Sequence, residues 1–128
     1  MFVNFTNHPS AKWSGSQLNA AVQYAEIRDV PFPAVPPQAS EAYVASLAEE
    51  YTKTILSLKP KAVLCQGEFS LCFAVTAALI TNGVDVLCAC SERKVTEITL
   101  PSGATEKRIE FEFAGFRKYA MTIKSTRT

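Results

Sequence analysis

The sequence has almost no excess charge and no long hydrophobic run, and each of these absences excludes a class of protein. Thirteen Lys and Arg residues stand against twelve Asp and Glu residues, which gives a formal charge of +1. General binders of duplex DNA or RNA carry a strong basic excess, so that class is excluded. The longest apolar run, Leu71–Ile80, is too short to span a bilayer, so no membrane partner is expected.

The cysteines lack the spacing of a zinc or redox site, and the common cofactor motifs are missing. Cys65, Cys72, Cys88 and Cys90 lie in apolar stretches without a CxxC pair, and residues 1–10 do not resemble a signal peptide. We expect four reduced thiols in a cytoplasmic protein and no metal centre. No Walker loop, GxGxxG or GxSxG is present, so no nucleotide cofactor is expected.

What is present is the composition of an ordinary globular protein. The chain is 48% hydrophobic and 20% charged over 128 residues. A chain of this length is expected to form one domain, residues 1–128, and to bury a core large enough to need no disulfide or metal.

Short apolar runs alternate with helical stripes over residues 1–90. Strands are expected at 2–5, 27–30, 62–65 and 86–90, and the last two are continuously apolar, as in strands covered on both faces. Helices are expected at 18–25, at 41–58 after the N-cap Ser40, and from 67–70 to 82–83. This alternation predicts an α/β fold, a Rossmann-like parallel sheet flanked by helices.

The pattern changes at Ser91. Residues 91–94 are interpreted as a loop, followed by strands at 94–100 and around 108–113 that are joined through Pro101–Ala104. We expect a C-terminal β-hairpin appended to the parallel sheet. Residues 116–123 are a candidate further strand, and residues 124–128 a frayed end.

The simplest strand order is 2-1-3-4, which reverses between strands one and three. Ligands bind such sheets beyond the carboxyl ends of the strands, at that switch point. Three predicted loops lie there, at 6–10, 66–70 and 91–94. They contain the candidate site residues, which are Asn7, His8, Ser10, Gln66, Gly67, Glu68, Ser70, Ser91 and Arg93.

Each candidate also has a structural interpretation. His8 either caps a turn or binds a ligand and moves protons. Gly67 is needed either for tight packing or for amides that hold a phosphate. Glu68 could occupy that anion site itself or orient a sugar hydroxyl. Arg93 and Lys94 either form a solvated strand entry or clamp an anion. Cys65 is interpreted as a buried thiol in preference to a nucleophile paired with His8.

The first residues, Phe2-Val3-Asn4-Phe5-Thr6-Asn7-His8-Pro9-Ser10 followed by Gln17-Leu18, resemble the opening of small CRISPR-associated proteins of the CARF-like group. In that group a strand ending in Asn-Phe-Ser/Thr-His-Pro leads into a helix near a Gln-Leu pair. Residues 62–93 are similar only as strand, small-residue turn, buried helix and strand.

The resemblance implies a Rossmann-like homodimer that binds cyclic oligoadenylate, a second messenger, and in some members cuts it without a metal. It implies His8 as the acid–base residue, with Arg93 and the amides of Gly67–Ser70 on phosphate. Asn7, Ser10 and Gln66 would hold ribose or base. The helix at 71–80 is apolar on more faces than one sheet contact would cover, which independently suggests a surface for a homodimer, with burial by the appended hairpin as the alternative. The alternatives are a non-catalytic binding or protein-interaction module and an unrelated small-molecule enzyme using the same crevice.

Overall fold

The computed structural model of the protein describes residues 1–121. Its elements in chain order are β1 (Phe2–Phe5), a short 3-10 helix (Ser10–Lys12), α1 (Gly15–Val22), β2 (Ile27–Asp29), α2 (Glu41–Ser57), β3 (Ala62–Cys65), α3 (Phe69–Thr81), β4 (Asp85–Thr99) and β5 (Thr105–Lys118). The expected frayed end, residues 124–128, lies outside the described residues.

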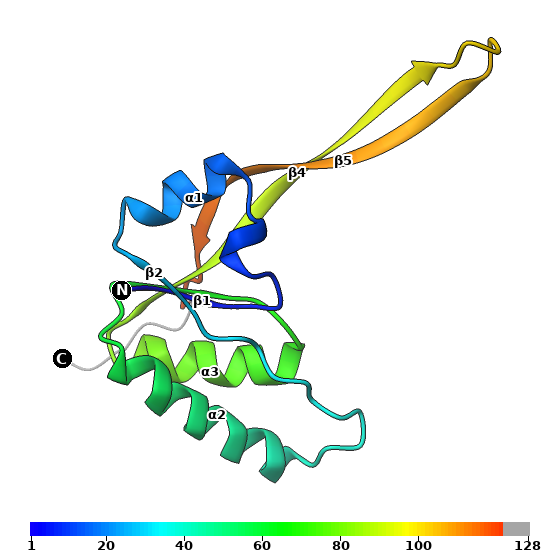
Figure 1. The fold of residues 1–128 in the computed structure, drawn as a ribbon. Helices are drawn as coiled ribbons and strands as arrows, with labels where there is room; N and C mark the ends of the chain where they lie inside the picture. Colours follow the sequence, from blue (N-terminus) through cyan, green and yellow to red (C-terminus); the bar gives the residue numbers. More distant parts are fainter. Residues whose placement is uncertain (122–128) are drawn as a thin grey trace.

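The strands form one sheet in the order β2-β1-β3-β4-β5. The pairs β1–β2, β1–β3 and β3–β4 are parallel, and β5 is antiparallel to β4. The predicted α/β fold, the parallel order 2-1-3-4 and the C-terminal hairpin are confirmed. Figure 1 shows α1 on one face of the sheet and α2 with α3 on the other.

Both faces of the central strands are buried, as their continuous apolar sequence requires. On one face, Val3, Phe5 and Val63 belong to the larger core cluster, which includes Ile55 of α2 and Val75 of α3. On the other face a smaller cluster joins buried side chains of the sheet and of α1, with two aromatic rings against it. Its members are Phe2, Ala21, Ala62, Leu64 and Leu87, with Trp13 and Phe116 packed against them.

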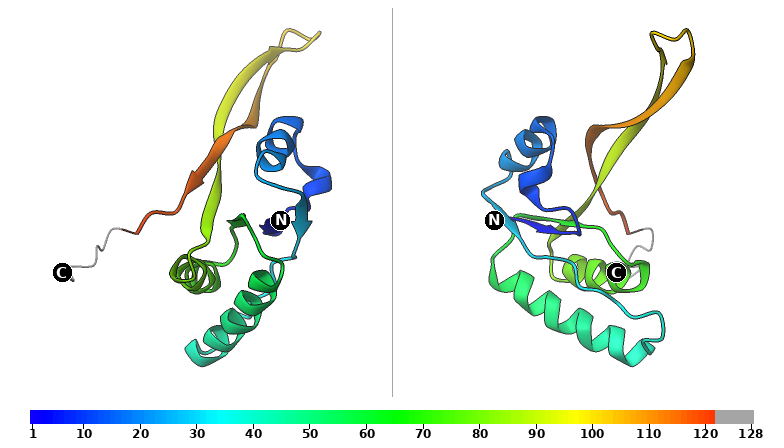
Figure 2. Two further views of the ribbon diagram at one scale, coloured as in Figure 1. Left: turned by 90° about the vertical axis from the view of Figure 1, so that its left-hand side faces the viewer. Right: turned by 45° about the vertical axis from the view of Figure 1, so that its right-hand side comes forward.

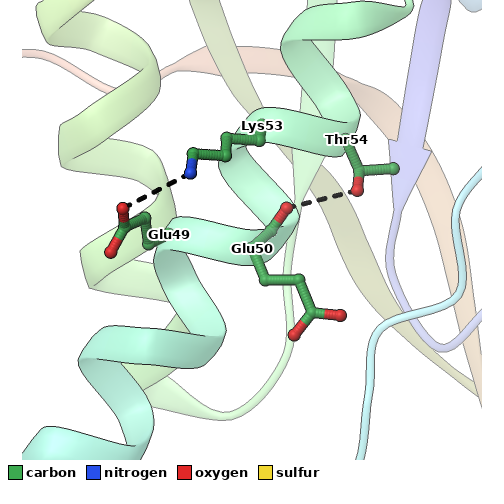
Figure 3. A network of polar contacts seen from close by, with 4 residues as sticks. All are labelled: Glu49, Glu50, Lys53 and Thr54. Carbon is green, nitrogen blue, oxygen red and sulfur yellow. Dashed lines mark hydrogen bonds and ion pairs between the residues drawn. The ribbon is translucent and has the colours of Figure 1, made fainter.

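Helix α2 begins where its N-cap predicts. The Ser40 hydroxyl accepts a hydrogen bond from the Tyr43 amide at 3.1 Å, which satisfies one free N–H of the first turn. Figure 3 shows its solvent side, where Lys53 lies 3.6 Å from the Glu49 carboxylate and the Thr54 hydroxyl donates to the Glu50 carbonyl. These exposed polar contacts leave the opposite stripe free to pack on α3.

Helix α1 is shorter than the sequence pattern indicated. It ends at Val22, so Ala25 lies beyond it. Only Ala21 of this helix is buried, and Val22 is 51% exposed. The apolar repeat at 18–25 therefore overestimated the contact between this helix and the sheet.

The loop predicted at 91–94 is wrong, because β4 runs without interruption from Asp85 to Thr99. These residues pair with β5, from Ser91 opposite Phe113 to Thr99 opposite Thr105, beyond a register shift at Cys90/Ser91. A two-stranded ribbon meets water on both faces, so polar side chains fit within a strand here. The candidate strand at 116–123 is not a separate element, because residues 116–118 are the end of β5. Residues 119–121 are irregular, and residues 122–123 lie outside the described residues.

The paired residues 91–99 and 105–113, with the turn 100–104, are called the arm below. The arm leaves the body of the molecule and extends away from the three helices (Figure 2). Within residues 1–121, no helix combines the length and apolar character needed to cross a membrane.

Candidate functional site

A cavity of about 600 Å³ lies beyond the carboxyl ends of β1 and β3, within the usual size range of small-molecule sites. Its wall is formed by the loop after β1, the start of α1, the end of β3, and the base of the arm. The lining residues on the body are Thr6, His8, Lys12, Trp13, Ser14, Ser16, Gln17, Leu64, Gln66 and Ala89. Those on the arm are Ser91, Lys94, Glu110, Phe111, Glu112 and Phe113. The cavity thus lies at the switch point that the strand order predicted.

The loop that presents His8 is fixed by a buried amide. The Asn4 side chain, 1% exposed, donates to the His8 carbonyl at 2.8 Å and to Asp29 at 3.0 Å, and it accepts from the Thr6 hydroxyl at 2.8 Å. The indole N–H of Trp13 also donates to the His8 carbonyl, at 3.1 Å. These bonds hold the backbone of His8, and the residue lines the cavity.

Asp29 fastens the other end of the same loop. Its carboxylate accepts from the Ser10 hydroxyl at 3.1 Å and from the Ser10 amide at 3.2 Å. The Ser10 side chain is therefore engaged in shaping the loop, and neither it nor Asn7 lines the cavity.

Gln66 follows β3 and joins the cavity wall to β4. Its side-chain oxygen accepts from the Ala89 amide at 2.7 Å, beyond the last paired residues of β3 and β4, Leu64 and Leu87. The bond extends the β3–β4 pairing and uses the acceptor of Gln66, so its NH₂ is the group left for a ligand.

The amides at the start of α3 are not available as a phosphate site. The Glu68 carboxylate accepts from the Ser70 amide at 3.0 Å and from the Leu71 amide at 2.8 Å, and the Ser70 hydroxyl donates to it at 2.7 Å. The Ser70 hydroxyl and the two amides lower the pKa of the Glu68 carboxyl. Of the two interpretations of Glu68, the structure shows the one in which its carboxylate occupies the anion site.

Gly67 is required by the ring of Phe32. A Cβ atom at this position would lie 2.6 Å from three carbon atoms of that ring, closer than carbon atoms pack. Phe32 is 5% exposed and stacks on Phe5, with ring centroids 4.7 Å apart. The close approach of Phe32 to the backbone explains this glycine without a ligand.

The base of the arm brings charge to the cavity. Lys94 forms an ion pair with Glu112, and both residues line the cavity. The hydrogen bond with Glu112 and the negative charge of that carboxylate raise the pKa of Lys94. Arg93 lies on the arm opposite Phe111 and does not line the cavity.

Of the nine candidates from the sequence, the structure therefore brings His8, Gln66 and Ser91 to one cavity. Glu68 and Ser70 serve the helix cap, and Gly67 serves packing. Lys94, which the sequence analysis considered with Arg93 as an anion clamp, lines the cavity. The sequence analysis missed Lys12, Gln17 and the arm carboxylates. Lys12 could have been identified from its position in the sequence between His8 and Trp13. No local pattern marks Glu110 or Glu112, because β5 reaches the cavity only by pairing with β4.

A pair of thiols lies on the opposite face of the sheet from this cavity. The sulfur atoms of Cys65 and Cys72 are 3.7 Å apart, and the Tyr119 hydroxyl donates to the Cys65 carbonyl at 2.9 Å. Hydrogen bonding from the Cys65 thiol lowers the pKa of Cys72 to about 6. The same bond and burial raise the pKa of Cys65. Cys65 belongs to the larger core cluster and is absent from the cavity lining, so it is not placed as a partner of His8.

Within residues 1–121, no three His, Cys, Asp or Glu side chains are grouped to hold a metal ion. The fold and the cavity define an α/β protein with a Rossmann-like sheet and a ligand-sized site at the switch point. The chain belongs to the family described as Uncharacterized protein MJ1673 family, whose model matches residues 1–117 and so includes the whole arm. Neither a curated protein nor a solved structure matches the chain.

Proposed function

We propose that the cavity binds a cyclic oligoadenylate and that the protein cleaves it, with His8 as the acid–base residue. The observation that carries the proposal is the meeting of His8, Lys12, Gln66 and Lys94 from three separate segments in one cavity at the switch point. The resemblance of residues 2–18 to small CARF-like proteins supplies the ligand class. Free cysteines accord with a cytoplasmic protein, the compartment in which we propose that it acts.

The groups around the cavity match the parts of such a ligand. Lys12 and Lys94 are the cations that would contact phosphate, a role that the sequence analysis gave to Arg93. The carboxylates of Glu110 and Glu112 can accept from the exocyclic amine of adenine, and Phe113 in the cavity lining offers a ring for base stacking.

The proposed reaction is an intramolecular transesterification. The ribose 2′-oxygen attacks the adjacent phosphorus, the bond to the 5′-oxygen breaks, and a 2′,3′-cyclic phosphate and a 5′-hydroxyl result. His8 would accept the proton of the 2′-hydroxyl or supply one to the leaving oxygen. A lysine beside the phosphate would stabilise the charge that develops in the transition state.

Lys94 is not free for this task until its ion pair opens. Its partner Glu112 would have to release it, or to turn toward the base, when a phosphate enters. Lys12 has no such partner among the ion pairs of the described residues, so we assign it the stronger phosphate contact.

Binding without cleavage is the second candidate function, and one observation favours it. Within the part of the chain that the structure describes, the hydrogen bonds of His8 involve its backbone, and none orients the imidazole. General acid–base catalysis needs an imidazole within hydrogen-bond reach of the reacting proton. If the ligand does not position it, the protein would hold the messenger without cutting it.

The experiment is incubation of the protein with cyclic tetra-adenylate and cyclic hexa-adenylate in EDTA, followed by chromatography for linear products. Cleavage by His8 predicts that His8→Ala lowers the single-turnover rate about a hundredfold or more while affinity changes little. Intact rings bound by the wild-type protein would favour the binding function. Full activity of His8→Ala would end the acid–base role.

A further inference from the structure

The two faces of the arm differ sharply in character. Residues opposite each other in an antiparallel pair share a face, so one face presents Val95 with Ile109 and Arg93 with Phe111, followed by Glu97 with Lys107. We call these six residues the apolar arm face. Its centre is unusually open, since Val95 and Ile109 are each 53% exposed and Phe111 is 71% exposed. The other face carries one apolar residue, Ile98, among charged and polar ones, which are Glu92, Lys94, Thr96, Glu106, Arg108, Glu110 and Glu112.

A two-stranded ribbon is marginally stable in water without a covering layer. The arm extends away from the helices in each view of Figures 1 and 2, so the body of its own chain does not supply that layer. The apolar arm face also continues the face of β4 that packs on α1. Every second residue of the strand points to that side, from Leu87 and Ala89 in the body to Ser91 and Arg93 in the arm. A buried surface of the body thus passes into an exposed one on the arm.

We propose that the apolar arm face binds the same face of a second copy of this chain. The two arms pack face to face and antiparallel, around a two-fold axis that passes between the Val95–Ile109 pairs. Such an interface is isologous, so residues equally distant from the axis along a strand face each other.

The charges of the face fit this arrangement. Arg93 and Glu97 lie at equal distances on either side of Val95, so each arginine meets the partner copy's glutamate, twice per dimer. On β5, Lys107 and Phe111 are equally distant from Ile109, so each ammonium meets an exposed ring, a favourable cation–π pair. The face is self-complementary about its own apolar centre.

A parallel stack of the two arms is opposed by the body. At the base of the arm, α1 and Trp13 cover the same side of β4 that carries Leu87 and Ala89. Stacked strand faces lie about 10 Å apart, and a parallel arrangement would bring two α1 layers into that space. The antiparallel arrangement puts the two bodies at opposite ends.

The same register brings the partner copy to the cavity. The pair Thr99–Thr105 of one arm lies opposite the pair Ser91–Phe113 of the other arm, because both pairs are four residues from the central pair. Ser91 and Phe113 line the cavity. The partner's turn 100–104 would then cover the mouth of the site. This last consequence concerns whatever the cavity binds, whereas the dimer itself needs no ligand and is tested without one.

The test exploits the paired charges. We expect the wild-type protein to be a dimer at about 20–50 µM by sedimentation and native mass spectrometry. Arg93→Glu places two glutamates together, and Glu97→Arg places two arginines together, so each variant should raise the dimer Kd about tenfold or more. A mixture of the two variants should form heterodimers near wild-type affinity, because each contact then pairs opposite charges. Arg108→Glu, the same charge change on the other face, is the matched control and should leave the dimer unchanged.

Three results would overturn the proposed dimer. A monomeric wild-type protein, or a dimer that neither single variant weakens, would overturn the proposal. The proposal would also be overturned if each single variant dissociates and the mixture of the two does not form heterodimers. That result would fit a parallel stack, in which Glu97 faces Lys107 of the other copy and mixing the variants restores no pair of opposite charges. Circular dichroism of each variant shows whether the body remains folded.

Discussion

Three consecutive residues after β3 have three different tasks at the carboxyl edge of the sheet. The backbone N–H of Gln66 donates to the Phe5 carbonyl, and its side-chain oxygen accepts from the Ala89 amide. Gly67 admits the ring of Phe32, and Glu68 caps α3. Only the first of these side chains reaches the cavity. Neighbours in the sequence at a strand end are thus divided between lining the cavity, packing and capping.

The packing role of Gly67 predicts the effect of a single methyl group. Gly67→Ala should lower the free energy of unfolding by about 1–3 kcal/mol, the usual cost of overpacking, because Phe32 would have to leave its place on Phe5. Urea unfolding followed by circular dichroism measures this. Gly15→Ala is the control, because a Cβ there meets nothing within 4 Å and should be neutral or slightly stabilising.

The thiol pair predicts an unusual pH dependence of alkylation. The Cys72 thiolate accepts a hydrogen bond from Cys65, which lowers its pKa to about 6. The rate of reaction with iodoacetamide should therefore rise through pH 6 and level off near neutrality, because the thiolate is the nucleophile. Mass spectrometry of the alkylated protein assigns the rate to Cys72.

Removing the donor supplies the control for that prediction. In Cys65→Ala the pKa of Cys72 should move up toward its ordinary value, and the midpoint of the rate profile should move with it. Cys90→Ser should change nothing, since Cys90 makes no contact with the pair among the hydrogen bonds described. A wild-type midpoint near that of an ordinary thiol would contradict the assigned hydrogen bonding.

At the scale of elements, helix α3 depends on the carboxylate of its N-cap residue, Glu68. Glu68→Ala should lower the Tm by a few degrees, since two amides of the first turn lose their acceptor. The pKa of Glu68 is lower in the folded state, so its contribution is present at neutral pH. It is lost as the pH falls through the titration of this carboxyl. The difference in Tm between wild type and variant should therefore shrink in acid, and a difference that grows there would contradict the cap.

Most elements could be predicted because local chemistry specifies them. The Ser40 cap and the apolar stripe fix α2, and the continuous apolar run 62–65 fixes β3. The error at 91–94 arose because polar residues were taken as the end of a strand. In the arm both faces reach water, so polarity and strand structure are compatible. The end of α1 was missed since its apolar repeat continues past the residues that contact the sheet.

At the scale of the whole molecule, the alternation of strands and helices was sufficient to predict the strand order and the edge of the sheet at which the cavity lies. Three of the candidate site residues in the cavity lining followed from that order, namely His8, Gln66 and Ser91. The part of the lining that comes from the arm depends on contacts between distant segments, such as the ion pair of Lys94 with Glu112. Only the antiparallel return of β5 creates these contacts, and no spacing within the sequence encodes them.

The most direct test of the central claim is the affinity of the cavity for cyclic oligoadenylate, measured by isothermal titration in EDTA. The account predicts saturable binding of cyclic tetra- or hexa-adenylate by the wild-type protein. Lys12→Ala should weaken it about tenfold or more, the range for one charge-assisted contact. Lys53→Ala, the same change on the exposed side of α2, should leave it unchanged. No binding of either ring by the wild-type protein, or equal affinities in the two lysine variants, would contradict the claim.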